Sequence, residues 1–171
     1  GQEHILGPGK LLRRSIETDR LMSLILYGPP GAGKTALAHL IAEKSKAHFI
    51  ALNAVTAGVA DIRRVAQEAA EERAQSGKRT LLFIDEIHRF TRVQQDALLP
   101  DVEQGTITLI GASTQNPFFA IIPALSSRSQ IFEFKPLREE DIRSILLRAL
   151  ADRERGFGAI AVTLTDEARD F

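Results

Sequence analysis

Residues 28–35 read Gly28-Pro29-Pro30-Gly31-Ala32-Gly33-Lys34-Thr35. This stretch fits the pattern G-x-x-x-x-G-K-[ST], in which glycines let the backbone turn with positive φ and approach an anion without a Cβ in the way. Successive N–H groups of such a loop point into one concavity and bind phosphate oxygens. The lysine places a positive charge on the β- and γ-phosphates, and the threonine hydroxyl can ligate Mg²⁺. The stretch therefore predicts a loop that binds a nucleoside triphosphate.

The segments on either side of this loop provide the context that the motif requires. Residues 23–27 form a short apolar run typical of a buried strand, and residues 35–44 are rich in helix formers. The positive end of that helix dipole adds to the attraction for phosphate. A plain Pro/Gly turn is the alternative, but it would not need Lys34 and Thr35 at this spacing. The residues expected around the phosphates of ATP or ADP are Gly28, Pro29, Pro30, Gly31, Ala32, Gly33, Lys34, Thr35 and Ala36.

The composition is typical of a globular protein without a strong charge bias. The 171 residues are 44% hydrophobic, which is enough for one well-buried domain and part of another. Because 22 basic residues balance 22 acidic ones, the overall charge indicates neither a nucleic-acid nor a membrane partner. The absence of cysteine excludes disulfides and thiolate metal sites. No apolar run approaches the roughly 20 residues of a membrane span, and no signal peptide is found, so we expect a cytoplasmic protein.

Strand-like and helix-like runs alternate along the chain, which is typical of α/β proteins. Further strands are expected at residues 48–52, 80–85, 106–111 and 130–134. Further helices are expected at residues 60–76, 91–103 and 138–153. The strand at 80–85 has a continuous apolar core, as a central strand covered on both faces should.

A domain boundary is expected at residues 135–137, dividing the chain into a nucleotide-binding α/β domain (1–136) and a second part (137–171). The helix at 138–153 is amphipathic, with Ile142, Ile145 and Leu146 on one face. Thr165-Asp166-Glu167 has the acidic residues of a first helical turn. We therefore expect the sequence to end inside a second, helical domain.

Two carboxylates, Asp85 and Glu86, follow the apolar strand at 80–85. At a strand tip beside a phosphate loop, Asp85 can hold Mg²⁺, usually through water. Glu86 can orient and deprotonate an attacking water molecule. A solvated Asp-Glu pair is the alternative, but its combination with the loop at 28–35 favours a hydrolytic site.

Three further segments make the chain resemble the AAA+ ATPase module: Asn53 after the second strand, Ser113-Thr114 after the fourth, and Ser127-Arg128-Ser129 before the fifth. The resemblance implies a three-layer P-loop fold with a five-stranded parallel sheet in the order 5-1-4-3-2. Helices would cover both faces of the sheet, and the start of a helical lid would follow at 137–171.

The resemblance also implies roles for individual residues. Thr114 falls at the sensor-1 position, where a polar side chain touches the γ-phosphate or the attacking water, with Ser113 as the substitute. Arg128 resembles the arginine finger that clamp loaders insert in trans into a neighbouring site. Asn53 falls where the family often restrains the catalytic glutamate, although Asn at a strand end is often a turn residue. The first ten residues resemble the segment that packs around adenine, which implies contacts from His4, Ile5 and Leu6.

Several sequence segments are similar to the MgsA/RarA group of replication-associated recombination proteins rather than to clamp loader subunits or RuvB. These segments are the first four residues, Gly-Gln-Glu-His, and residues 52–59, 85–90 and 94–100. The resemblance implies ATP hydrolysis stimulated by single-stranded or forked DNA, in a tetramer that meets replication proteins such as single-strand-binding protein. The group's sensor-2 arginine and tetramerisation segments would follow Phe171, so these residues alone are expected to hydrolyse ATP weakly.

DNA contacts are expected at arginines near two helix starts: Arg63, Arg64, Arg89 and Arg92. A solvated helix face is the alternative for each of them. The four histidines show no metal-ligand spacing and are interpreted as structural. The main function hypothesis is a DNA-maintenance ATPase. A clamp loader subunit, a RuvB-like branch-migration motor, a non-hydrolysing nucleotide scaffold and a small-molecule kinase are the alternatives.

Overall fold

The computed structural model describes residues 1–160, 162 and 165. The chain divides into two units, one formed by residues 2–136 and the other by residue 1 together with residues from 137 onward. Each unit is described separately below. The expected helix start at Thr165-Asp166-Glu167 lies outside the described residues, except for Thr165 itself.

The first unit contains a five-stranded parallel sheet. Its strands are β1 (Ser23–Tyr27), β2 (His48–Asn53), β3 (Thr80–Asp85), β4 (Ile107–Ser113) and β5 (Ser129–Glu133). Their order is β2-β3-β4-β1-β5, and all four neighbouring pairs are parallel. This order is 5-1-4-3-2 when it is read from the other edge, so the predicted fold class is confirmed.

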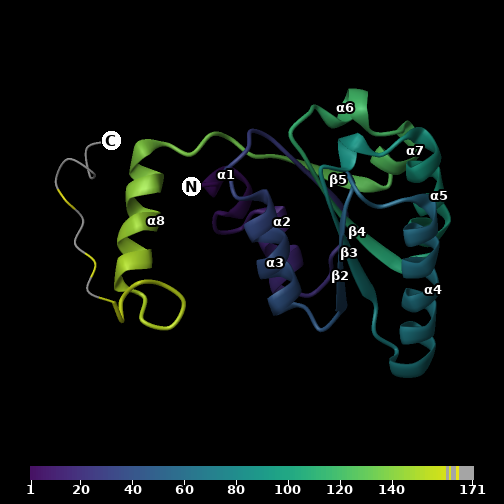
Figure 1. The fold of residues 1–171 in the computed structure, drawn as a ribbon, viewed down its shortest axis with the longest axis horizontal. Coiled ribbons are helices and arrows are strands. Elements are labelled where there is room, and N and C mark those ends of the chain that lie inside the picture. Colours follow the sequence, from purple (N-terminus) through teal and green to yellow (C-terminus); the bar gives the residue numbers. More distant parts are fainter. Residues whose placement is uncertain (161, 163–164, 166–171) are drawn as a thin grey trace. The chain divides into compact units, whose positions relative to one another are not determined.

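Helices lie on both sides of the sheet (Figure 1). They are α1 (Glu3–Leu6), α2 (Leu11–Glu17), α3 (Lys34–Lys44), α4 (Val59–Ser76), α5 (Arg92–Glu103), α6 (Pro117–Ala120) and α7 (Pro123–Ser126), with a 3₁₀ turn, η1, at Ile87–Arg89. Figure 1 shows α2 and α3 on one face of the sheet and α4 and α5 on the other.

Two hydrophobic cores explain why β3 is apolar at four successive positions. In β3, Leu81 and Phe83 point into the core beneath α2 and α3, and Leu82 and Ile84 point into the core beneath α4 and α5. All four side chains are at most 3% exposed. Because successive strand residues face opposite sides, a strand covered twice needs an apolar residue at each position. The sheet is thus rigid where its carboxyl ends carry the polar residues.

The fourth strand extends further than predicted. Residues 106–111 were expected, but β4 runs from Ile107 to Ser113, because its pairing with β1 continues to the Tyr27–Ser113 register and Gly28 N donates to Ser113 O at 3.1 Å. Ser113 is therefore fully buried inside the sheet rather than beyond it. The short helices α1, α2, α6 and α7 and the turn η1 had not been predicted.

The second unit contains α8 (Glu139–Ala151). Ile142, Ile145 and Leu146, the predicted apolar face of this helix, are 41–51% exposed. Among the described residues, no helix is long and apolar enough to cross a membrane.

Candidate nucleotide site

The loop between β1 and α3 has the backbone geometry that its sequence predicts. Gly28, Gly31 and Gly33 have φ values of 147°, 74° and 98°, all in the range that favours glycine. A Cβ at Gly28 would lie 2.2 Å from the carbonyl oxygen of Phe134, so only glycine fits beneath the chain that follows β5. The loop ends at Lys34, where α3 begins with its N–H groups directed toward the loop.

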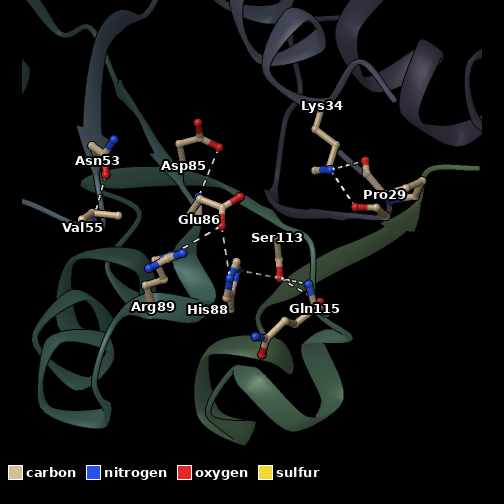
Figure 2. A network of polar contacts seen from close by, with 11 residues as sticks. Pro29, Lys34, Asn53, Val55, Asp85, Glu86, His88, Arg89, Ser113 and Gln115 are labelled. Carbon is tan, nitrogen blue, oxygen red and sulfur yellow. Dashed lines mark hydrogen bonds and ion pairs between the residues drawn. The ribbon is translucent and has the colours of Figure 1, made fainter. Parts of the chain in front are cut away.

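Lys34 lies inside this loop and is 7% exposed. Its Nζ donates hydrogen bonds to Gly28 O at 2.7 Å and to Pro29 O at 2.8 Å, as Figure 2 shows. Burial lowers the pKa of Lys34 below its usual 10.5, and the carboxylates of Glu86 and Asp85 act in the opposite direction. This coupling connects the lysine electrostatically with the acidic end of β3.

The two carboxylates stand where β3 ends. Asp85 is the last residue of the strand, and its Oδ1 accepts a hydrogen bond from Glu86 N at 3.1 Å. Glu86 has φ 57° and ψ 39°, a left-handed conformation that costs an L-residue about 1–2 kcal/mol. Such strain persists only where surrounding contacts hold the residue, and it is concentrated at functional sites.

The Glu86 carboxylate has two cationic or polar partners on η1. His88 Nε2 lies 3.2 Å and Arg89 Nε 3.6 Å from Oε2 (Figure 2). Ile87, the first residue of η1, packs onto β4 at Gly111. This close approach requires glycine, because a Cβ at Gly111 would lie 2.9 Å from Ile25 Cδ1 and 3.0 Å from Ile87 Cδ1. The turn after β3 is therefore fixed by packing as well as by polar contacts.

A magnesium site would draw on Thr35 and Asp85. Thr35 is exposed in the first turn of α3, and Asp85 is partly buried at the end of β3. Among the described residues there is no group of three or more His, Cys, Asp or Glu side chains that could hold a metal. One hydroxyl and one carboxylate suit Mg²⁺, which keeps several waters and binds phosphate oxygens beside few protein ligands.

The first residues pack beside the phosphate loop. Gln2 Nε2 donates to Ala32 O at 3.2 Å and to Lys135 O at 2.8 Å, and Gln2 Oε1 accepts from Lys135 N at 3.1 Å. Ile5 is buried in the core beneath α3, and His4 Nε2 lies 2.8 Å from Glu133 O. Leu6 packs against the same core. The segment expected around adenine is thus tied to both the loop and the end of β5.

The candidate sensor residues have different surroundings. Thr114 is exposed in the bend after β4, whereas Ser113 is fully buried. Ser113 Oγ lies 3.2 Å from His88 Nδ1, accepts from Gln115 N at 3.0 Å and donates to Gln115 O at 2.7 Å. Thr114 is thus the more accessible hydroxyl, and its sensor role stays a prediction.

Asn53 ends β2 beside β3, in register with Asp85. Its Oδ1 accepts a hydrogen bond from Val55 N at 2.8 Å, which closes a turn (Figure 2). The contacts that hold Glu86 come instead from His88 and Arg89. The expected restraint of Glu86 by Asn53 stays a prediction.

Arg128 follows α7 at the entry to β5. Its Nη2 lies 2.6 Å from Glu103 Oε1, and its Nη1 donates to Ala124 O at 2.9 Å. The segment that carries it is held by Gln95, a 2%-exposed amide that donates to Ala120 O at 3.0 Å and accepts from Ile122 N at 2.9 Å. The arginine is 43% exposed and is therefore accessible to solvent, and its role as a trans-acting finger stays a prediction.

The four arginines expected to bind DNA all lie on the surface near the starts of α4 and α5. Arg64 is shared between Asp61 at 3.8 Å and Glu68 at 3.7 Å. Arg89 contacts Glu86, and Arg92 lines a surface hollow together with the exposed side chains of Phe118 and Phe119. Arg63 is exposed, and within the described part of the chain it has no ion-pair partner.

Sequence reasoning did not single out Glu103, and it interpreted His88 as structural. Neither residue belongs to a nucleotide-binding motif, so the motifs gave no reason to assign a role to either of them. The signal that could have found His88 is its position on a turn directly after a catalytic carboxylate.

Three features together define a P-loop ATPase domain. They are the phosphate loop with its buried lysine, the Asp-Glu pair at the end of β3, and the parallel sheet with the strand order β2-β3-β4-β1-β5. The family model for AAA, described as "ATPase family associated with various cellular activities", matches residues 24–137. The chain belongs to this AAA ATPase family.

Its relatives agree with the expected group, and that prediction is confirmed. Replication-associated recombination protein A of Escherichia coli (strain K12) is 48% identical over 169 residues, which are 99% of this chain and 38% of that protein. The Bacillus subtilis (strain 168) protein of the same name is 46% identical over 170 residues, 99% of this chain and 39% of that one. The chain thus spans less than two fifths of these relatives.

Solved structures show the same fold. The Thermotoga maritima RuvB Holliday junction branch migration motor is 28% identical, with a TM-score of 0.68 over 88% of this chain and 51% of that one. Another T. maritima RuvB structure has a TM-score of 0.73 at 24% identity, covering 99% of this chain and 55% of that chain.

Proposed function

We propose that this chain is the Mg²⁺-dependent ATP-hydrolysing domain of a DNA-maintenance ATPase that acts at stalled or damaged replication forks. The observation that carries the hydrolytic part is the combination of a buried lysine in the phosphate loop with two carboxylates, Asp85 and Glu86, at the end of β3. The lysine is buried in the phosphate loop and coupled electrostatically to both carboxylates, and Glu86 is held in a left-handed conformation. A passive nucleotide-binding scaffold would not need a restrained carboxylate at this place.

Each residue has a distinct task in this proposal. The loop amides and Lys34 bind the phosphates, exchanging the contacts that Nζ makes with Gly28 O and Pro29 O. Thr35 and Asp85 would hold Mg²⁺, which neutralises charge on the β- and γ-phosphates when bound. Glu86 takes a proton from the attacking water while Thr114 orients it.

Arg128 completes the site of a neighbouring subunit in this proposal. The arginine neutralises charge that develops on the γ-phosphoryl oxygens, and a finger supplied in trans contributes about 10³–10⁵ to the rate. A homo-oligomer is therefore required for full activity. In the proposed division of the chain, residues 1–136 form the catalytic domain and residues 137–171 begin the lid.

The role in DNA maintenance rests on the likeness to the replication-associated recombination proteins. Exposed arginines at the starts of α4 and α5 would track the phosphates of single-stranded or forked DNA without reading sequence. A RuvB-like branch-migration motor is the second candidate, favoured by the structural likeness to RuvB at 28% identity.

The test is the ATPase rate of the intact protein without DNA and with single-stranded, duplex, forked and four-way-junction DNA. Stimulation by single strands or forks is expected, and stimulation by four-way junctions alone would favour the second candidate. Glu86→Gln should bind ATP normally and lose hydrolysis. Undiminished turnover in that variant would refute the general-base role.

A further inference from the structure

His88 is a buried histidine that contacts the proposed catalytic base. Its side chain is 6% exposed, and it lies between Glu86 on one side and Ser113 on the other (Figure 2). Nε2 is 3.2 Å from Glu86 Oε2, and Nδ1 is 3.2 Å from Ser113 Oγ. Both ring nitrogens are thus engaged, each with a different strand end.

The protons available on Ser113, His88 and Glu86 decide which group donates in the contact between His88 and Glu86. The Ser113 hydroxyl has one proton and two acceptors within reach, His88 Nδ1 and Gln115 O. If the proton points to Nδ1, a neutral His88 carries its own proton on Nε2. If it points to Gln115 O, Nδ1 has to donate to the Ser113 hydroxyl oxygen instead. An ionised carboxylate can only accept, so the contact of 3.2 Å with Glu86 is a hydrogen bond only when His88 Nε2 carries a proton and donates it.

Ser113 is a firm anchor for this histidine. It is fully buried at the end of β4, and its Oγ also accepts from Gln115 N at 3.0 Å. Its carbonyl oxygen accepts from Gly28 N, the first amide of the phosphate loop, at 3.1 Å. The contacts therefore run from the Glu86 carboxylate to the strand that supports both the loop and Thr114.

Arg89, the other partner of Glu86, is a weaker restraint. Its Nε lies 3.6 Å from the carboxylate, and its side chain is 57% exposed. An exposed pair is screened by solvent and salt, whereas the buried imidazole is screened much less. Glu86 also has a left-handed backbone that L-residues rarely adopt, and surrounding contacts have to hold such a conformation in place.

We propose that His88, anchored by Ser113, is a positioning residue that directs the carboxylate of Glu86 for proton abstraction. This inference rests on the proposed function, because it takes Glu86 as the general base. His88 acts through Glu86 and does not touch the nucleotide. The proposal gives His88 a role that the sequence interpretation, a structural histidine rather than a metal ligand, did not include.

The test compares four variants of the intact protein: His88→Ala, His88→Gln, Ser113→Ala and the control His48→Gln. His48, on the edge strand β2, is the control because its Nε2 also lies 3.2 Å from a carboxylate, that of Glu68 on α4. His88→Ala should lower kcat about 10- to 100-fold, the effect of a misplaced catalytic group, while KM and the Kd for a fluorescent ADP analogue stay unchanged. His48→Gln should match the wild type.

Two further results distinguish positioning from stability. His88→Gln should recover part of kcat, because the glutamine amide supplies an N–H donor in place of Nε2–H. Ser113→Ala should lower kcat as well, although it leaves the histidine in place. The thermal midpoint is measured for each variant. If His88→Ala does not fold, Ser113→Ala decides, and an unchanged kcat in Ser113→Ala overturns the proposal.

Combining His88→Ala with Glu86→Gln distinguishes a failure of the positioning role of His88 from a failure of the general-base role of Glu86. If Glu86→Gln keeps wild-type turnover, the general-base assignment itself fails. If Glu86→Gln loses turnover while His88→Ala keeps its kcat, the base stands and the positioning role is wrong. His88→Ala should cause no additional loss in the Glu86→Gln background. Independent, multiplying losses would also overturn the proposal.

Discussion

Glu103→Gln is expected to raise the ATPase rate, because Glu103 holds the proposed trans-acting arginine within its own subunit. Arg128 Nη2 lies 2.6 Å from Glu103 Oε1, with side chains that are 43% and 42% exposed. To reach a neighbouring site, the guanidinium must leave this carboxylate. The glutamine variant removes the charge and keeps the shape of the side chain, so the arginine is released more easily.

The magnitude follows from the exposure of the pair. Ion pairs between solvent-exposed side chains contribute about 0.2–1 kcal/mol, since water and salt screen them. At 25 °C this energy corresponds to a gain of about 1.4- to 5-fold in turnover. Arg128→Ala should instead lose about 10³–10⁵, the contribution of a finger supplied in trans. Two substitutions in one ion pair should thus have effects of opposite sign.

The assay is steady-state ATP turnover of the intact protein at saturating nucleotide, measured over a range of protein concentrations. Glu68→Gln is the control, since it removes an exposed carboxylate paired with Arg64 on α4 rather than with the arginine finger. If Glu103→Gln lowers turnover, or if Arg128→Ala keeps wild-type turnover while assembled, the reasoning is refuted. Similar small losses in both variants would indicate a purely structural pair.

Two further predictions concern the phosphate loop. Because burial lowers the pKa of Lys34 below 10.5, its proton is lost at a lower pH than that of an ordinary lysine, and ATP affinity should fall as pH rises through that lowered pKa. Bound phosphates favour the charged amine, so calorimetry at pH values near that lowered pKa, in buffers of different ionisation enthalpy, should detect proton uptake on binding, and Lys34→Ala should abolish it. Gly28→Ala should lower the free energy of unfolding by more than about 1 kcal/mol, since its Cβ would lie 2.2 Å from Phe134 O. Gly31→Ala, with nothing within 4 Å, is the control, and an equal loss in thermal midpoint for both would contradict the steric argument.

The fold could be predicted largely from two of its three inner strands, β1 and β3. The runs that became β1 and β3 are apolar at successive positions and end at polar or glycine residues, so their ends coincide with those expected. The end of β4 could not be predicted in this way. Its last residues, Gly111, Ala112 and Ser113, are small and have little intrinsic strand preference, and their strand conformation comes from pairing with β1.

The nucleotide motifs could be predicted from sequence because they depend on local spacing. The partners of the catalytic groups could not. Glu103 meets Arg128 because α5 and α7 pack together, and Ser113 meets His88 because Ile87 packs against the strand that contains Ser113. Such pairs form through tertiary packing, so the two partners have no characteristic spacing along the sequence.

Three of the four charged groups proposed for catalysis have partners that could be exchanged during the reaction. Lys34 donates to the carbonyls of its own loop, Glu86 accepts from His88, and Arg128 pairs with Glu103. These contacts differ in burial, and burial determines how readily each can be exchanged. The exposed Arg128 pair is screened and breaks at little cost, which suits a group that must reach another subunit. The contact of Glu86 with the buried histidine is retained more strongly, which suits a base that must keep one direction. Lys34 is as buried as His88, but the oxygens of a bound triphosphate can replace carbonyls that carry only partial charge. We therefore expect the contacts of Lys34 and Arg128 to be exchanged during the ATPase cycle, while Glu86 keeps its contact with His88.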